Sequence, residues 1–143
     1  HQGYSIEESV AFISSRDGAR QRGEDYSFAV FDAVTERFLG GVGVNQINRI
    51  HRMANLGYWI RQSETGRGAA TAATLLAARY GFQELGLQRI EIVAAIGNVA
   101  SQKVARKAGA RKEGARLRKR LLINGEVQDA VLFSLIAEDL KNF

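Results

Sequence analysis

A glycine turn joins a short aromatic strand to a long alanine-rich helix, and this junction limits the possible folds more than any other feature. We expect the strand over Met53–Ile60 and the helix over residues 68–85, closing at Gly86. The turn between them, residues 65–70, reads Thr-Gly-Arg-Gly-Ala-Ala. Glycine lacks the Cβ that keeps an anion away from the backbone, and the first N–H groups of a helix are unpaired. The junction therefore predicts an α/β fold with a site for an anion such as pyrophosphate.

Two other nucleotide-binding turns compete with this interpretation. A mononucleotide-binding P-loop needs Lys-Ser or Lys-Thr after its last glycine, but Ala69 and Ala70 stand there. A dinucleotide-binding turn has an acidic residue about 20 positions further on, where Glu91 lies. However, Glu91 falls inside an expected strand, and Thr71 replaces the third glycine or alanine. The P-loop is excluded, and a dinucleotide-binding module is the less favoured alternative.

The other expected elements are a first helix, two pairs of consecutive strands, and a strand followed by a short helix. A capping box of Ser5 and Glu8 predicts a first helix that runs to about Arg16. Apolar patterns predict strands over residues 28–34, 38–44, 89–95, 110–122 and 127–136, and a helix over residues 99–107. Asn124-Gly125 is a strong signal for a tight hairpin between the last two strands. No repeat or linker divides the chain, so we expect one mixed-sheet domain over residues 1–143.

Composition narrows the class of protein. A chain of 143 residues with 45% hydrophobic and 24% charged residues is typical of one soluble globular domain. With no long apolar run, no cysteine and two histidines, we expect no membrane span, no disulfide and no metal site. We expect a cytoplasmic monomer or homodimer. A first residue that is His1 and not methionine is typical of a processed form or a fragment.

Positive charge gathers in one stretch of the chain. The net charge is +5, and eight lysines and arginines fall within residues 106–120, opposed there by Glu113 alone. Such a stretch favours an anionic partner, namely a phosphate-rich cofactor, an acidic protein or RNA. It also fits a solvated face with no partner. Nucleic acid is the least favoured partner because aromatic residues do not interleave the cations.

Several separate segments together resemble one family. They are Asn55-Leu56-Gly57-Tyr58-Trp59-Ile60, the turn at residues 65–70, Phe82-Gln83-Glu84-Leu85-Gly86-Leu87, Arg89-Ile90-Glu91, Asn98-Val99-Ala100-Ser101 and the segment 109–114. Their order and spacing, over roughly residues 5–140, resemble the GNAT N-acetyltransferases, specifically the RimJ/RimL-like branch. The resemblance implies an α/β fold with a mixed, mostly antiparallel sheet that splays at its centre between flanking helices. In the family, another strand and helix precede the segment that begins at Ser5.

The resemblance also implies how acetyl-coenzyme A binds. It would lie in a V-shaped opening between the strand ending at Ile60 and the strand ending near Ala95. The implied contacts are the backbone of Trp59, Ile60 and Arg61 for the pantetheine, Gly66, Arg67, Gly68, Ala69 and Ala70 for the pyrophosphate, Asn98 for the thiol end, and Ser101 near the sulfur. Asn98 also fits a simple helix N-cap, and Ser101 fits a solvent-facing helix residue.

The implied reaction is direct attack of a neutral amine on the thioester, with no covalent enzyme intermediate. Where many GNAT enzymes have a tyrosine as the acid, this chain has Ala105, so Ser101 is the best candidate to protonate the thiolate. Tyr58 and Trp59 are expected to pack in the core or the cleft more than to hold substrate.

The sequence does not identify the general base that removes the proton of the amine. Relatives often carry a glutamate at the position of Asn55, and RimL has another where Lys119 and Arg120 lie. A water chain helped by Glu91, Glu113 or Asp129 could remove the proton, or an α-amine of low pKa could need little help.

The leading hypothesis is N-acetylation of a primary amine, with a protein N-terminal α-amine, favoured as acidic by the basic stretch, ahead of polyamines or antibiotics. The alternative is an acetyl-coenzyme A-binding module with weak or no catalysis, because the family's glutamates and tyrosine are missing.

Overall fold

The computed structural model describes residues 11–15, 25–61, 63, 65 and 68–140. In this part of the chain, seven strands form one sheet in the order β1-β2-β3-β4-β5-β7-β6. The strands are β1 (Ala11–Ser15), β2 (Tyr26–Asp32), β3 (Phe38–Asn48), β4 (Met53–Ile60), β5 (Arg89–Ala95), β6 (Arg111–Ile123) and β7 (Glu126–Leu135). The helices are α3 (Ala69–Gln83), α4 (Val99–Lys107) and the short 3-10 helix η2 (Ala137–Leu140).

The expected first helix is wrong over residues 11–15. These residues form β1, which pairs antiparallel with β2 from Ala11 opposite Asp32 to Ser15 opposite Phe28. A short apolar run does not distinguish a strand from a helix by its spacing, and the edge of β2 offers unpaired backbone groups that a strand can satisfy. The capping box of Ser5 and Glu8 lies outside the described residues.

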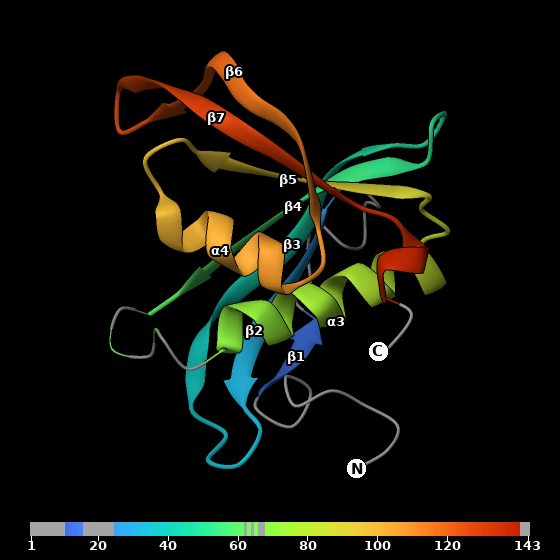
Figure 1. Ribbon diagram of the computed structural model, residues 1–143. Coiled ribbons are helices and arrows are strands. Elements are labelled where there is room, and N and C mark those ends of the chain that lie inside the picture. Colours follow the sequence, from blue (N-terminus) through green and yellow to red (C-terminus); the bar gives the residue numbers. More distant parts are fainter. Residues whose placement is uncertain (1–10, 16–24, 62, 64, 66–67, 141–143) are drawn as a thin grey trace.

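The sheet splays at its centre, as expected. Each pair of neighbouring strands is antiparallel except β4 and β5, which run parallel. Their ladder has three residue pairs and ends where Asn55 lies opposite Glu91. Beyond that point the two strands diverge toward their carboxyl ends (Figure 1). The opening between Ile60 and Ala95 exposes the edges of both strands.

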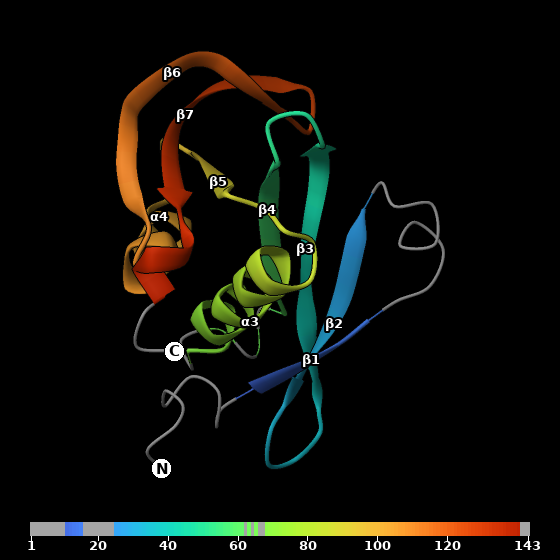
Figure 2. The same cartoon turned by 90° about the vertical axis from the view of Figure 1, so that its right-hand side faces the viewer.

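Helices α3 and α4 lie on the same side of the sheet (Figures 1 and 2). Helix α3 packs closely because small side chains face the strands: Ala72, Ala73, Ala77 and Ala78 are fully buried. Beneath them lies a core of large apolar side chains from the central strands, including Leu56, Ile90, Ile92, Phe133 and Leu135. Burial of this apolar surface is the main force that holds the helix layer on the sheet.

Local turn signals agree with the structure. Gly86 and Gly109 have φ of 69° and 96°, the left-handed conformation that ends helices α3 and α4. Asn124 and Gly125 have φ of 51° and 82°, which matches the turn of a tight β6–β7 hairpin. No described helix is long and apolar enough to cross a membrane.

Candidate active site

A cleft of about 530 Å³ lies where β4 and β5 diverge. Its walls come from the end of β4, the start of α3 and one side of α4, and they include Trp59, Ile60, Gly68, Ala69, Ala70, Asn98 and Ser101. The structure therefore brings together most of the predicted site residues. The backbone N–H of Arg61 donates to Leu39 O (2.7 Å) and so belongs to the β3 side of β4. Gly66 and Arg67 lie outside the described residues.

The outer end of the cleft suits an anion. Gly68 is the N-cap of α3 and has φ of 79°; no side chain caps the helix, and its first turn has no acidic residue. Free N–H groups and the helix dipole attract negative charge at such a start. Among the described residues that line the cleft, the charged ones are Lys103 and Lys107. These features fit the phosphates of coenzyme A.

The inner end is organised by Asn98. Its side-chain oxygen accepts the backbone N–H of Ser101 (3.0 Å), so Asn98 is the N-cap of α4. The Gln102 side chain donates to the carbonyls of Ala95 and Ile96 (3.2 and 2.9 Å). These bonds fix the start of α4 against the end of β5 and hold the Ser101 side chain at the cleft.

Tyr58 contacts Ser101 directly, which the sequence reasoning missed. Its phenol oxygen lies 2.8 Å from the Ser101 carbonyl oxygen and 3.0 Å from Ser101 Oγ. Burial raises the pKa of the Tyr58 phenol, and the hydrogen bond with Ser101 opposes that shift in part. Alternation along β4 could have shown that Tyr58 points to the same face of the sheet as Leu56 and Ile60. The sequence around β4 contains no signal for a contact between Tyr58 and helix α4.

Two of the three carboxylates considered as helpers for the base are tied to one arginine. Arg89 donates to Glu91 (3.0 Å) and, with two nitrogens, to Glu113 (3.0 and 2.7 Å). Ser134 Oγ also donates to Glu113 (2.7 Å). Bonds from Arg89 and then Ser134 lower the pKa of Glu113 to about 2. A carboxylate with such a low pKa is a poor general base near neutral pH.

The third carboxylate, Asp129, has a structural role. It accepts the backbone N–H of Lys119 (2.8 Å) and Arg116 Nε (2.7 Å). The Lys119 bond and then the Arg116 bond lower the Asp129 pKa. Asn55, which stands where relatives carry a glutamate, donates its amide to Asn45 Oδ1 (3.1 Å). These groups are therefore engaged with protein partners.

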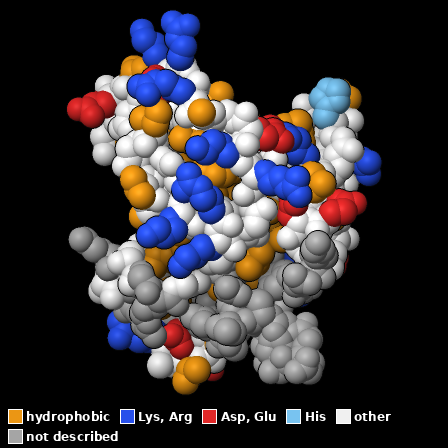
Figure 3. Space-filling view, in the orientation of Figure 1, with side chains coloured by type: hydrophobic (Ala, Val, Ile, Leu, Met, Phe, Trp, Pro, Cys, Tyr) orange, Lys and Arg blue, Asp and Glu red, His pale blue; other side chains and the backbone are white. Residues whose placement is uncertain are grey.

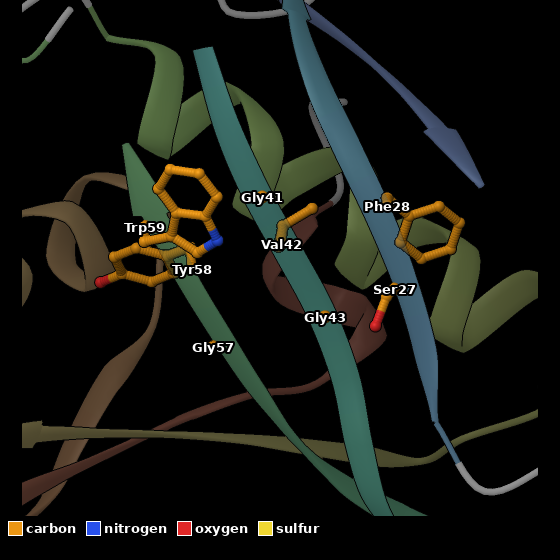
Figure 4. A pocket seen from close by; sticks show the side chains of 8 residues that line it. All are labelled: Ser27, Phe28, Gly41, Val42, Gly43, Gly57, Tyr58 and Trp59. Atoms are coloured by element: carbon orange, nitrogen blue, oxygen red, sulfur yellow. The ribbon is translucent and has the colours of Figure 1, made fainter. Parts of the chain in front are cut away.

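A second hollow, of about 240 Å³, lies over β2, β3 and β4. Figure 4 shows bare backbone at Gly41, Gly43 and Gly57 between the side chains of Trp59 and Ser27. A Cβ on Gly41 would lie 2.7 Å from Trp59 Nε1, so the indole rests on this glycine. Trp59 also meets Phe38 edge to face, yet 53% of its surface is exposed. Trp59 also lines the larger cleft, which confirms the expectation of a core or cleft-lining aromatic.

In the described part of the chain, no cluster of three or more His, Cys, Asp or Glu side chains could hold a metal ion.

Comparisons with known proteins place this geometry in a family. The model of the "Acetyltransferase (GNAT) domain" matches residues 1–111. The "Probable N-acetyltransferase YjcK" of Bacillus subtilis is 34% identical over 137 residues, covering 95% of this chain and 75% of that protein. A solved structure described as a "putative ribosomal-protein-serine acetyltransferase" of Vibrio cholerae has a TM-score of 0.73 and 35% identity, covering 82% of this chain and 67% of that one.

A structure of the spermidine N-acetyltransferase SpeG of Vibrio cholerae is also similar, with a TM-score of 0.72 and 27% identity, covering 82% of this chain and 67% of that one. The matched relatives thus share the fold but differ in the amine named for them. The splayed sheet, the cleft and these matches lead to one conclusion: the chain belongs to the GNAT acetyltransferase family, in its RimJ/RimL-like branch, and is by class an acetyl-coenzyme A-dependent acyltransferase.

Proposed function

We propose that the protein transfers the acetyl group of acetyl-coenzyme A to the N-terminal α-amine of a protein, within a ternary complex. The observation that carries the proposal is the chemistry of the cleft, which has an anion site at one end and a positioned hydroxyl at the other. The similarity to a ribosomal-protein-serine acetyltransferase supports a protein acceptor.

The roles of the residues follow from their places along the cleft. The start of α3 at Gly68–Ala70 binds the pyrophosphate through backbone N–H groups, aided by Lys103 and Lys107. The free edge of β4 at Trp59 and Ile60 pairs with the pantetheine amides, because β5 has diverged from it. Asn98 contacts the thiol end through the part of its amide that the helix cap leaves free. The cosubstrate supplies an activated acetyl thioester to this site.

Ser101 provides the proton for the departing thiolate. The Tyr58 phenol has one hydrogen to donate, and Ser101 has two acceptor atoms within reach of it, the carbonyl oxygen and Oγ. The phenol donates its hydrogen to the Ser101 carbonyl oxygen (2.8 Å), and the 3.0 Å contact with Ser101 Oγ holds the serine hydroxyl in one rotamer at the wall of the cleft. Tyr58 thereby acts as a positioning residue that orients the proton donor.

The acid–base properties of the site favour an α-amine. Glu91, Glu113 and Asp129 are held in ion pairs, and Glu113 has a pKa of about 2. Near pH 7.4, about 30% of an α-amine is neutral, compared with about 0.1% of an alkyl amine such as that of lysine. An α-amine can therefore attack without a strong enzyme base.

Acetylation of a polyamine is the second candidate, favoured by the similarity to SpeG. Against it stand the net charge of +5 and the two lysines in the cleft, which repel a polycation. A binding module without turnover is the third candidate. It predicts coenzyme A affinity without thiol release.

The test is thiol release from acetyl-coenzyme A with N-terminal peptides and with spermidine, measured between about pH 6 and 9. We expect peptides to react with kcat/KM that rises with pH and levels off at the amine's own pKa. No release with any peptide, or a clear preference for spermidine, would contradict the proposed acceptor.

A further inference from the structure

Three glycines leave bare backbone on the face of the sheet that is turned away from helices α3 and α4. Gly43 pairs with Gly57 and Gly41 pairs with Trp59, so the glycines of β3 and β4 lie side by side. The hollow of about 240 Å³ lies over them (Figure 4). A Cβ on Gly57 would meet no heavy atom within 4 Å, and one on Gly43 would meet none closer than 3.6 Å. These two glycines therefore keep open a space that a larger side chain would fill.

The hollow lies on the opposite face of β4 from the cleft. Leu56 is buried beneath the helices, and Tyr58 contacts Ser101 of α4. Because side chains alternate along a strand, Gly57 and Trp59 belong to the other face. Tyr58 and Trp59 line both the cleft and the hollow. The two spaces therefore adjoin at the last residues of β4, beside the edge that β5 leaves unpaired.

This arrangement gives the acceptor amine a direction of approach. In the proposed reaction, the thiolate departs toward Ser101, on the helix side of β4. The amine attacks the carbonyl carbon from the side that the departing sulfur leaves open, which is the side of the hollow. The side chain next to that amine then lies over Gly57 and Gly43.

We propose that the hollow binds the first side chain of the acceptor protein and selects a long, unbranched apolar residue, namely a retained initiator methionine. This inference rests on the proposed function and names the class of acceptor. Neighbouring strands lie about 4.8 Å apart, so a side chain that crosses from Gly57 to Gly43 needs about four heavy atoms in line. Methionine has this length, and its thioether makes favourable contacts with an aromatic ring such as the indole of Trp59.

The lining of the hollow disfavours other first residues. Lysine and arginine side chains gather on the side of the molecule that carries the helices (Figure 3), whereas no described charged residue lines the hollow. A charged first side chain would lose hydration there without gaining a partner. A serine or alanine side chain is too short to cross from Gly57 to Gly43, so it would leave most of the hollow to water.

Trp59 can report binding directly, because it is the sole tryptophan of the chain, is 53% exposed and lines the hollow. The full chain with saturating coenzyme A is titrated with tryptophan-free peptides that differ only in their first residue, which is methionine, norleucine, serine or glutamate. We expect the methionine and norleucine peptides to shift the indole emission to the blue and to protect it from acrylamide quenching. The serine and glutamate peptides should leave the emission unchanged.

The second measurement is kcat/KM for thiol release from acetyl-coenzyme A with the same peptides. We expect the methionine peptide to exceed the serine peptide about tenfold, because its side chain buries more apolar surface. Gly57→Val fills the hollow from its floor, where a Cβ meets open space, so it should abolish both the preference and the blue shift. Gly57→Ala adds only the Cβ and should give an intermediate preference.

Ala115→Val is the matched control, since Ala115 is exposed on β6 and does not line the hollow. It should keep the preference and the blue shift. The ratio of the two peptides within each variant cancels any effect that is common to both.

Two results would overturn the proposal. One is a serine peptide that binds and reacts as well as the methionine peptide, and the other is a methionine preference or blue shift that survives Gly57→Val. Because docking is read from the emission of Trp59, it is decided even without turnover. Absent thiol release with every peptide would count only against the proposed function.

Discussion

Replacement of Tyr58 by phenylalanine tests the positioning of Ser101. The variant keeps the ring that lines the cleft and removes the oxygen that contacts the Ser101 carbonyl and Oγ at 2.8 and 3.0 Å. Without that oxygen the serine side chain is free to sample three staggered rotamers, so the productive one is occupied about a third of the time. In the parent chain, a hydrogen bond worth about 1 kcal/mol favours the productive rotamer about fivefold over each of the other two, so this rotamer is occupied about 70% of the time. We therefore expect kcat to fall about two- to threefold.

The assay separates this effect from a loss of fold or of cosubstrate binding. Initial rates with a peptide acceptor should show a lower kcat, while the KM for acetyl-coenzyme A changes by less than about twofold, because the start of α3 is untouched. Tyr80→Phe is the matched control, since Tyr80 is a partly buried tyrosine that packs on Tyr26 and Phe28. It should leave kcat unchanged.

A double-mutant cycle gives the result that would refute the reasoning. Ser101→Ala should lower kcat about a hundredfold if its hydroxyl is the acid. Because Tyr58 acts through that hydroxyl, adding Tyr58→Phe to Ser101→Ala should cost almost nothing more. If the second substitution lowers kcat as much as it does in the parent chain, Tyr58 does not act through Ser101.

Three further predictions concern the frame of the site. In Gly41→Ala, the new Cβ would displace the indole of Trp59, the sole tryptophan of the chain. The tryptophan fluorescence should therefore shift to the red with little change in Tm, and an unchanged emission maximum would contradict the contact. Gly68→Ala should lower stability by about 1–2 kcal/mol because φ is 79°, and weaken coenzyme A binding in calorimetry, whereas Gly68→Asn should be milder. Glu113 has a folded pKa of about 2 against its usual 4.5, so its contribution to stability is present above pH 4.5 and lost as pH falls toward 2. Melting curves of Glu113→Gln across that window should show a smaller acid-induced loss, and an unchanged profile would exclude the pair as a stabilising contact.

Much of the fold could be predicted because its signals are local. The expected bounds of β4, β5 and α4 agree with the structure, since each is marked by its own apolar pattern and by nearby glycines. The alternative interpretation of Asn98, a helix N-cap, is confirmed, and its contact with the thiol end stays a prediction. The β6–β7 turn was expected at Asn124-Gly125, where both residues have positive φ.

The remaining features depend on contacts between distant residues. Tyr58 and Ser101 are 43 positions apart, and Arg89 and Glu113 are 24 apart, so no local pattern links them. Strand β6 has a bulge at Lys119 that depends on Asp129 in the next strand, and the sequence of β6 alone reads as an uninterrupted strand. The prediction of a first helix was wrong over residues 11–15 because these residues pair with the edge of β2, which lies outside the helical pattern of the sequence.

The parallel pairing of β4 and β5 explains why the residues proposed for cosubstrate binding and for proton transfer line one cleft. Two parallel strands end at the same edge of a sheet, and here each is followed by a helix, so the N-termini of α3 and α4 meet at the splay. The two helix starts are not equivalent. Asn98 already satisfies a backbone N–H of α4, whereas no side chain caps α3 at Gly68. An anion gains more at the uncapped start, which supports the proposed pyrophosphate contact at α3 and the proposed role of the Ser101 hydroxyl at the capped start of α4.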